Sequence, residues 1–278
     1  MPYITVAQEK NSPVDLYYER YGEGQPIVLT HGWPLSGKMW EKQVSALVAG
    51  GFEVIAYDRR GFGQSSRPWS GYDYDTFAAD LKALIDGLDL MDAVLVGFSM
   101  GGGEVVRYLS LFGSERVAKL VLAASVTPFL YQSANNPEGG VTDEMIAQFE
   151  GGVVHDRPGF LDVFVGQFFT AGDAADLVSP ATHRYFEGIA ALASPQASLE
   201  SLRAFCTTDF RDEIASLTLP VLVLHGDADV VNPVQVSGER VKKALPHSEL
   251  VIIAGGPHGL NFTHAEQFNQ ALLSFIKA

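Results

Sequence analysis

A serine, a histidine and an aspartate stand at positions typical of nucleophilic catalysis. The serine, Ser99, lies in the segment GFSMG at residues 97–101, a G-x-S-x-G pattern between a strand-like apolar run at 93–98 and an amphipathic segment. This context predicts a sharp strand-to-helix turn that exposes the serine hydroxyl. The glycines leave room around the turn, and the helix N–H groups point at the place where negative charge would develop. A serine that only caps the helix is the plainer alternative.

A serine hydroxyl needs a base, because it is a poor nucleophile near neutral pH. Of seven histidines, His258 lies just after the last strand-like run, on a loop expected at the same sheet edge as Ser99. We therefore predict His258 as the general base. His31 and His225 are interpreted as residues that structure turns, since a glycine follows each of them. The inserted segment or the exposed surface is expected to hold His155, His183, His247 and His264.

The carboxylate that orients the base is expected in the loop GDADVV at residues 226–231. We predict Asp229, because it lies farther from the strand and can reach the histidine loop. Asp227 can instead bond the N–H groups of its own turn. Counted from Asp227, a calcium loop of the EF-hand type would need Gly and Glu where the chain has Asn232 and Gly238. No metal site is therefore predicted.

Strand-length apolar runs alternate with helix-length amphipathic segments over most of the chain, and this pattern predicts a sheet covered by helices on both faces. The first ten residues alternate like a strand. We expect 14–21 and 26–30 to form an antiparallel pair across the turn at 22–24. Buried parallel strands are predicted at 52–57, 93–98, 117–124, 220–225 and 249–254.

The interval 128–212 breaks this rhythm, since it lacks a convincing strand and is rich in glycine, proline and phenylalanine. It predicts a helical cap inserted between core segments 1–127 and 213–278. Such a cap would cover the strand ends, where open sheets of this class bind ligands. Most of its phenylalanines are expected to form the cap's own small core.

Composition limits the partners. The chain has 278 residues, a formal charge of −14 and one cysteine, Cys206. The negative charge argues against nucleic acid or an anionic membrane as a partner, and a lone cysteine excludes an internal disulfide. Neither a secretory leader nor a membrane-spanning run is evident. We therefore expect a cytoplasmic protein that acts on a small neutral molecule.

The order Ser99, Asp229, His258 is that of the α/β-hydrolases. Their oxyanion hole needs two backbone N–H donors, which we predict to be Met100, after the nucleophile, and Trp33, in the segment HGWP. Apolar residues beside these segments predict an apolar substrate pocket. We expect it to include Pro34, Phe98, Val126, Phe129, Val230, Val231 and Leu260.

The sequence resembles the cofactor-free haloperoxidases, or perhydrolases, and the related aryl esterases and γ-lactamases of the α/β-hydrolase superfamily. The resemblance is carried by HGWPL at 31–35, YDRRGFGQS at 57–65, GFSMGGGE at 97–104 and HGDAD at 225–229. It implies an α/β fold, with a mostly parallel eight-stranded sheet, flanking helices and a helical cap. It also implies the same triad and oxyanion amides, no cofactor, and a homo-oligomer.

The resemblance further implies two reactions of one acyl-enzyme, ester hydrolysis and perhydrolysis. In perhydrolysis a carboxylic acid and hydrogen peroxide give a peracid, which oxidises chloride or bromide without haem, flavin or vanadate. In this family a proline after the oxyanion tryptophan accompanies that activity, and here it is Pro34. Pro34 restricts the backbone of Trp33, so the Trp33 carbonyl could point at the peroxide. The alternative is that Pro34 only stiffens the loop.

Other functions of the same fold stay open on the sequence. A lactonase or γ-lactamase, a C–C hydrolase or a hydroxynitrile lyase would keep the serine triad, and a non-catalytic ligand-binding protein could keep the fold. Haloalkane dehalogenases and epoxide hydrolases are disfavoured, because they need aspartate at the position of Ser99. The cap matches the family least, so the sequence does not specify the substrate.

Overall fold

One sheet organises the computed structural model, which describes residues 2–171 and 177–278. Its strand order is β1-β2-β4-β3-β5-β6-β7-β8. The pairs β1–β2 and β2–β4 are antiparallel, and the other pairs are parallel. The prediction of a mostly parallel, eight-stranded sheet is confirmed. The strands are β1 Tyr3–Glu9, β2 Ser12–Tyr21, β3 Pro26–Thr30, β4 Glu53–Tyr57, β5 Ala93–Phe98, β6 Val117–Ala123, β7 Val221–Gly226 and β8 Glu249–Ile253.

The expected pairing of the segments 14–21 and 26–30 is wrong. β2 pairs with β1 and β4, with Tyr18 opposite Tyr57, and β4 lies between β2 and β3. The turn after β2 therefore crosses to the far side of β4. The reason is burial: four of the five β3 residues are buried, because β3 has a parallel neighbour on each side.

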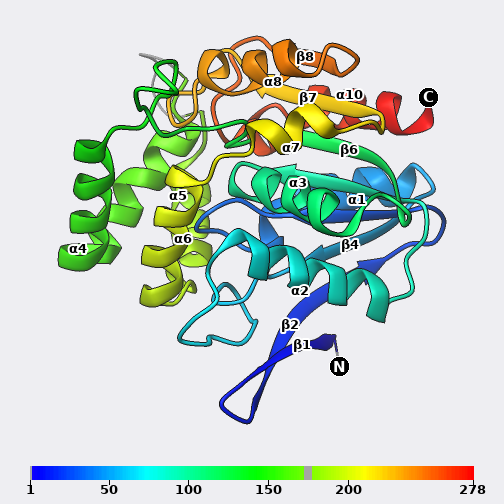
Figure 1. Ribbon diagram of the computed structural model, residues 1–278, viewed down its shortest axis with the longest axis horizontal. Helices are drawn as coiled ribbons and strands as arrows, with labels where there is room; N and C mark the ends of the chain where they lie inside the picture. The colour runs from blue at the N-terminus through cyan, green and yellow to red at the C-terminus, as the bar shows by residue number, and fades with distance from the viewer. Residues whose placement is uncertain (1, 172–176) are drawn as a thin grey trace.

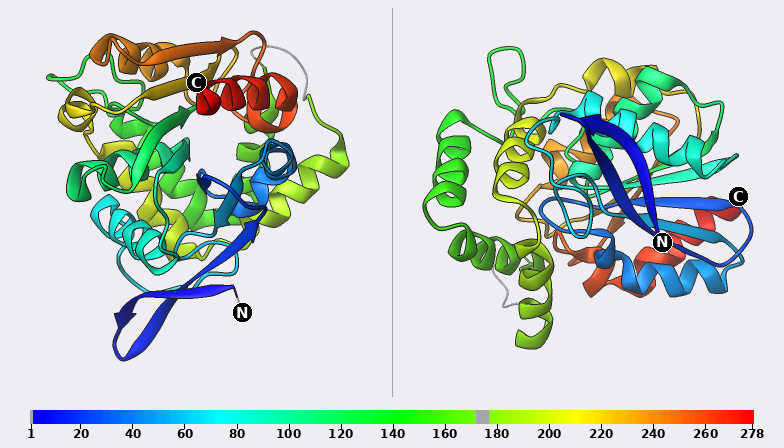
Figure 2. Two further views of the ribbon diagram at one scale, coloured as in Figure 1. Left: turned by 90° about the vertical axis from the view of Figure 1, so that its right-hand side faces the viewer. Right: turned by 90° about the horizontal axis from the view of Figure 1, so that it is seen from below.

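Helices cover both faces of the sheet. The view from below in Figure 2 shows α1 and α10 together on one face, with α2 and α3 on the other. Their apolar faces point toward the sheet, although Phe112 at the end of α3 is exposed. The helices are α1 Glu41–Ala49, α2 Tyr74–Gly87, α3 Met100–Phe112, α4 Asp143–Phe169, α5 Pro180–Ala191, α6 Pro195–Thr207, α7 Arg211–Ser216, α8 Gly238–Ala244, α9 Leu260–Thr263 and α10 Ala265–Lys277.

Helices α4, α5 and α6 leave the sheet after β6 and lie together at one side of the molecule (Figure 1). Helix α4 consists of two arms that meet at Asp156, whose φ of −149° and ψ of 79° are not helical. Asp156 Oδ1 accepts a hydrogen bond from Gly159 N, and so caps the second arm. Within the described residues, no helix has the length and apolar character needed to cross a membrane.

Candidate active site

Ser99 occupies a tight turn between β5 and α3, with φ 51° and ψ −119°. A non-glycine residue rarely adopts such angles, so the neighbours must make space for the turn. A Cβ atom on Gly97 would lie 2.5 Å from the carbonyl oxygen of Gly101, and one on Gly101 would lie 2.5 Å from that of Thr30. Both glycines are therefore required by close backbone approach.

The three residues predicted as a triad lie in contact. His258 Nε2 is 3.0 Å from Ser99 Oγ, and His258 Nδ1 is 2.7 Å from Asp229 Oδ2. With a proton on Nδ1 donated to Asp229, Nε2 is free to accept the serine proton. The rings of Phe98 and Phe168 pack edge-on against the imidazole, at centroid distances of 5.2 and 4.9 Å. The histidine is thereby held on both its polar and its apolar sides.

Asp229 is held as a carboxylate by its surroundings. Its Oδ1 accepts hydrogen bonds from Val231 N at 2.9 Å and Asn232 N at 2.7 Å. Burial alone would raise the pKa of Asp229, but the charge of His258 and the hydrogen bonds from His225 and His258 outweigh it. The pKa of Asp229 is therefore held well below its ordinary range.

The two neighbours of Asp229 do not behave as expected. Asp227 bonds Gly255 N at 2.7 Å, on the loop that carries His258, whereas Asp229 itself bonds the amides of its own turn. His225 is more than a turn residue, because its Nε2 lies 2.8 Å from the backbone carbonyl oxygen of Asn232 and 3.3 Å from Asp229 Oδ2. Its place at the strand end, four residues before Asp229, was the available signal for this contact.

Two backbone amides stand where the oxyanion hole is expected. Met100 is the first residue of α3, so its N–H is free of the helical hydrogen bonds. The chain at Gly32 passes so close to Ser99 that a Cβ there would lie 3.1 Å from the serine Cβ. Among the described residues, neither Trp33 N nor Met100 N has a hydrogen-bond acceptor. Both are available to a ligand atom at Ser99.

The peptide unit that carries the Trp33 N–H is fixed from behind. The Gly32 carbonyl oxygen lies 2.8 Å from His31 Nδ1 and accepts a bond from Leu35 N at 3.0 Å. His31 Nε2 accepts a bond from Arg59 N at 3.0 Å, so the imidazole proton must be on Nδ1 and is donated to Gly32. Burial, together with the Arg59 charge, lowers the pKa of His31, which agrees with a neutral ring. Since C=O and N–H point in opposite directions in a trans peptide, this fixes the Trp33 N–H.

A cavity of about 440 Å³ opens above Ser99 and Trp33. Val126, Val230 and Val231 line it, in agreement with the sequence analysis. The other four expected residues do not line it: Pro34, Phe98, Phe129 and Leu260. Phe98 lies under His258, Leu260 is fully buried, and Phe129 packs against Tyr131 and the Arg211 guanidinium. Pro34 is buried and follows a cis peptide bond.

Most of the cavity wall comes from residues 128–212 and was not identified from the sequence. Four of the nine phenylalanines in 128–212 line the cavity, and the other five are buried, so the expectation that most of them are core rather than lining agrees with the structure. The four that line it are Phe149, Phe160, Phe164 and Phe205. The remaining wall is formed by Leu130, Gly140, Val141, Met145, Gln148, Gln167, Leu202, Cys206, Asn232, Pro233 and Val236. The run of phenylalanines in 128–212 was the available sequence signal for this wall. The sequence did not show which of them face the cavity.

The cavity wall is apolar and uncharged. Among its described residues there is no Asp, Glu, Lys or Arg. The rings of Trp33 and Phe164 pack edge to face, with centroids 5.0 Å apart. Trp33 Nε1 donates a hydrogen bond to the backbone carbonyl oxygen of Ser198 at 3.0 Å, which ties the oxyanion loop to α6. Burial raises the pKa of the Cys206 thiol to about 12, so this side chain is neutral.

Residues that could hold a metal ion lie away from the cavity. Asp162, His183 and Glu187 offer three ligand atoms within 4.8 Å of one another, where α4 meets α5. None of the three lines the cavity. The chemistry available at Ser99 is therefore that of a nucleophile, a base and two amide donors.

Comparisons with known proteins identify the family of this chain. A family model described as the alpha/beta hydrolase fold matches residues 25–265. The chain is 49% identical to a putative non-heme chloroperoxidase of Synechocystis sp., and 34% identical to a bifunctional esterase/perhydrolase of Acinetobacter calcoaceticus, each over 100% of both chains. The crystal structure of a bromoperoxidase from Bacillus anthracis is 50% identical and has a TM-score of 0.97, with 99% of each chain covered. The resemblance drawn from the sequence is thus confirmed, and the chain belongs to the α/β-hydrolase family, among its non-heme haloperoxidases.

Proposed function

We propose that this protein hydrolyses carboxylic esters through an acyl-enzyme on Ser99, and that it also transfers the acyl group to hydrogen peroxide. One observation carries the proposal: the hydrogen-bonded series Asp229, His258 and Ser99, with distances of 2.7 and 3.0 Å, ends at the floor of an apolar cavity. Relatives named esterase/perhydrolase and non-heme chloroperoxidase support both reactions.

Acylation uses each of these groups in turn. His258 Nε2 takes the proton as Ser99 Oγ attacks the ester carbonyl, and the new oxyanion accepts bonds from Trp33 N–H and Met100 N–H. Asp229 stabilises the imidazolium that forms. The tetrahedral intermediate then collapses, and the alkoxide leaves with the proton from His258. The product is an ester of Ser99.

Deacylation decides which reaction is observed. Water gives up a proton to His258 and releases the carboxylic acid. Hydrogen peroxide, attacking in the same way, releases a peracid. That peracid then passes one oxygen to a halide ion, and with one proton this gives hypohalous acid and regenerates the carboxylic acid. The protein's own groups serve both branches, because water and peroxide reach the same acyl carbon and the same base.

The first test is a parallel assay of wild type and Ser99→Ala. Hydrolysis of p-nitrophenyl acetate and bromination of monochlorodimedone, with acetate and peroxide present, should both fall by orders of magnitude. The matched control is Ser201→Ala, which removes a buried hydroxyl of α6 that has no hydrogen-bond partner among the described residues. Retention of either activity in Ser99→Ala, or absence of both in wild type, refutes the proposal.

We propose a role for Pro34 in the perhydrolysis branch, through the direction of the Trp33 carbonyl. Pro34→Leu should lower bromination relative to ester hydrolysis by up to about tenfold, the worth of one hydrogen bond to peroxide. The ratio of the two rates in wild type and variant measures this. An unchanged ratio contradicts the role and leaves Pro34 as a residue that stiffens the loop.

We also propose that 128–212 acts as a cap on a core made of 1–127 and 213–278. The support is topological, because β6 and β7 are neighbours in the sheet while α4, α5 and α6 lie between them in the sequence.

A further inference from the structure

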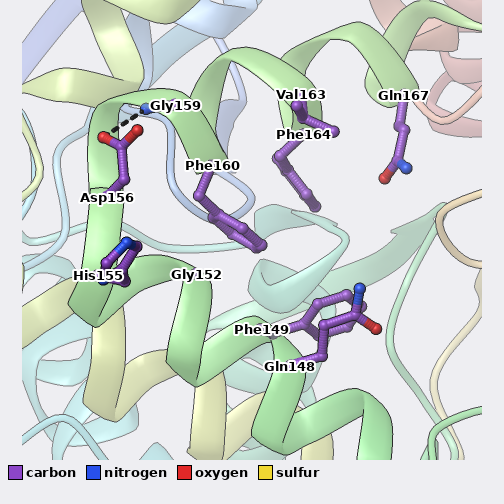
Figure 3. A pocket seen from close by; sticks show the side chains of 10 residues that line it. All are labelled: Gln148, Phe149, Gly152, His155, Asp156, Gly159, Phe160, Val163, Phe164 and Gln167. Atoms are coloured by element: carbon purple, nitrogen blue, oxygen red, sulfur yellow. Dashed lines mark hydrogen bonds between the residues drawn. The ribbon is translucent and has the colours of Figure 1, made fainter.

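A second pocket, which we call the outer pocket, opens between the two arms of α4. It has a volume of about 360 Å³. Figure 3 shows Gln148 and Phe149 on the first arm, with Phe160, Val163, Phe164 and Gln167 on the second. Its other lining residues are Gly152, His155, Asp156 and Gly159.

The outer pocket adjoins the cavity above Ser99. Five residues line both: Gln148, Phe149, Phe160, Phe164 and Gln167. These side chains stand between the two spaces and form part of the wall of each. The inner part ends at Ser99 and Trp33, and the outer part opens at the surface of the cap.

The bend in α4 builds this outer part. The non-helical angles of Asp156 turn the second arm away from the first, and Asp156 holds the turn through Gly159 N at 3.1 Å, the dashed line in Figure 3. Gly152 allows the arms to approach, since a Cβ at this position would collide with the Phe160 ring. That ring and Phe164 lie 6.4 Å apart, nearly parallel, and form an aromatic wall.

The lining suits a hydrocarbon. Its wall is made chiefly by Phe149, Phe160, Val163 and Phe164, and the described lining offers no lysine or arginine to an anion. Val163 is 61% exposed, an apolar surface that an occupant would remove from water. The polar groups of the pocket are the exposed side chains of Gln148, His155, Asp156 and Gln167.

The inner cavity is small for a long substrate. Its volume of about 440 Å³ lies at the lower end of the range of about 300–1,000 Å³ for small-molecule pockets. The distal end of a long chain can extend beyond this volume, and the outer pocket is the adjoining apolar space.

We infer that the outer pocket is a substrate subsite, which binds the distal end of a long apolar chain of the ester. The inference rests on the proposed function at Ser99. It identifies the substrate class as esters whose acyl or alkyl chain reaches past Phe160 and Phe164. Val163 is then a residue that determines chain-length specificity.

The test compares Val163→Trp with Val154→Trp on a series of p-nitrophenyl esters from acetate to decanoate. Val154 is the matched control, because it lies on the same helix, is 72% exposed and lines neither pocket. In wild type, kcat/KM should rise by up to about fourfold per methylene that enters the apolar site. Val163→Trp fills the outer pocket and should lower the decanoate-to-acetate ratio of kcat/KM at least about tenfold, which corresponds to losing two methylenes.

The outcomes separate the inference from the proposed function. Loss of the ratio in Val163→Trp alone supports the subsite. An equal ratio in wild type and Val163→Trp, or the same loss in Val154→Trp, overturns it while hydrolysis of the acetate ester continues. If wild type shows no Ser99-dependent hydrolysis of the acetate ester, the proposed function itself fails. Thermal unfolding of each variant establishes that it is folded.

Discussion

His31 provides a sharp test of how the oxyanion loop is held. One ring nitrogen, Nδ1, donates to the Gly32 oxygen, while the other, Nε2, accepts from Arg59 N. An asparagine amide can replace only the first nitrogen, and a glutamine amide only the second. His31→Asn thus keeps the donor behind the oxyanion hole, whereas His31→Gln keeps the acceptor for Arg59. The two variants divide the roles of one buried side chain.

The structure sets the magnitudes. Complete loss of an oxyanion donor typically costs about 10²–10³ in kcat. In His31→Gln the Gly32 oxygen keeps its bond from Leu35 N, so orientation of the Trp33 N–H is only partly lost. We expect kcat to fall about tenfold, or roughly 1.4 kcal/mol, with KM little changed. In His31→Asn the buried Arg59 N–H loses its acceptor, which costs about 1–3 kcal/mol of unfolding free energy.

The two variants should therefore rank in opposite orders. His31→Gln should have the lower kcat on p-nitrophenyl acetate, and His31→Asn the lower unfolding free energy in urea. Gln43→Met is a control for the loss of a buried polar network away from Ser99. The Gln43 amide donates a hydrogen bond to the backbone carbonyl oxygen of Asn261. If kcat follows stability, with His31→Asn the poorer enzyme, His31 acts only through the fold and the reasoning is refuted.

Three further predictions concern Asp229 and the uncharged cavity. Asp229→Asn should lower kcat for p-nitrophenyl acetate by about 10⁴. The amide oxygen still accepts the hydrogen bonds from Val231 N and Asn232 N, so the NH₂ group faces His258 Nδ1 and forces the wrong tautomer. A loss below about tenfold would contradict the assignment. The lowered pKa of Asp229 means that the unfolded state binds more protons below about pH 4. The stabilisation by the Asp229 carboxylate is present above that pH and is lost as the pH falls toward the folded-state pKa. In urea unfolding, the difference in unfolding free energy between wild type and Asp229→Asn should therefore shrink below about pH 4. A difference that stays constant with pH would contradict this. Because the described cavity wall has no cation, bromination in the presence of acetate should use neutral acetic acid. The bromination rate should then fall about tenfold per pH unit above the acid's pKa of about 4 to 5. If the rate of p-nitrophenyl acetate hydrolysis falls in parallel with pH, that explanation is refuted.

The parts of the site that could be predicted from the sequence are those written in short segments. GFSMG specifies a turn by the close approach of Gly97 to Gly101, and this requirement is local. The same holds for HGWP and the loop after β7. The cap differs, because its contribution depends on how whole helices rotate and bend. Phe160 and Phe168 are eight residues apart on one arm of α4, yet one lines the cavity and the other packs against His258.

The choice between Asp227 and Asp229 shows where local reasoning needs the sheet. β7 and β8 pair in parallel, with Gly226 opposite Ile253, so the loops that follow them leave the sheet side by side. Asp227, one residue past the strand, immediately meets Gly255 N and ties the two loops together. Two residues later the chain has turned, and Asp229 reaches His258 while its second oxygen holds that turn closed. The distance from the strand therefore selects Asp229 correctly. The reason is the register between β7 and β8, which cannot be read from a single sequence.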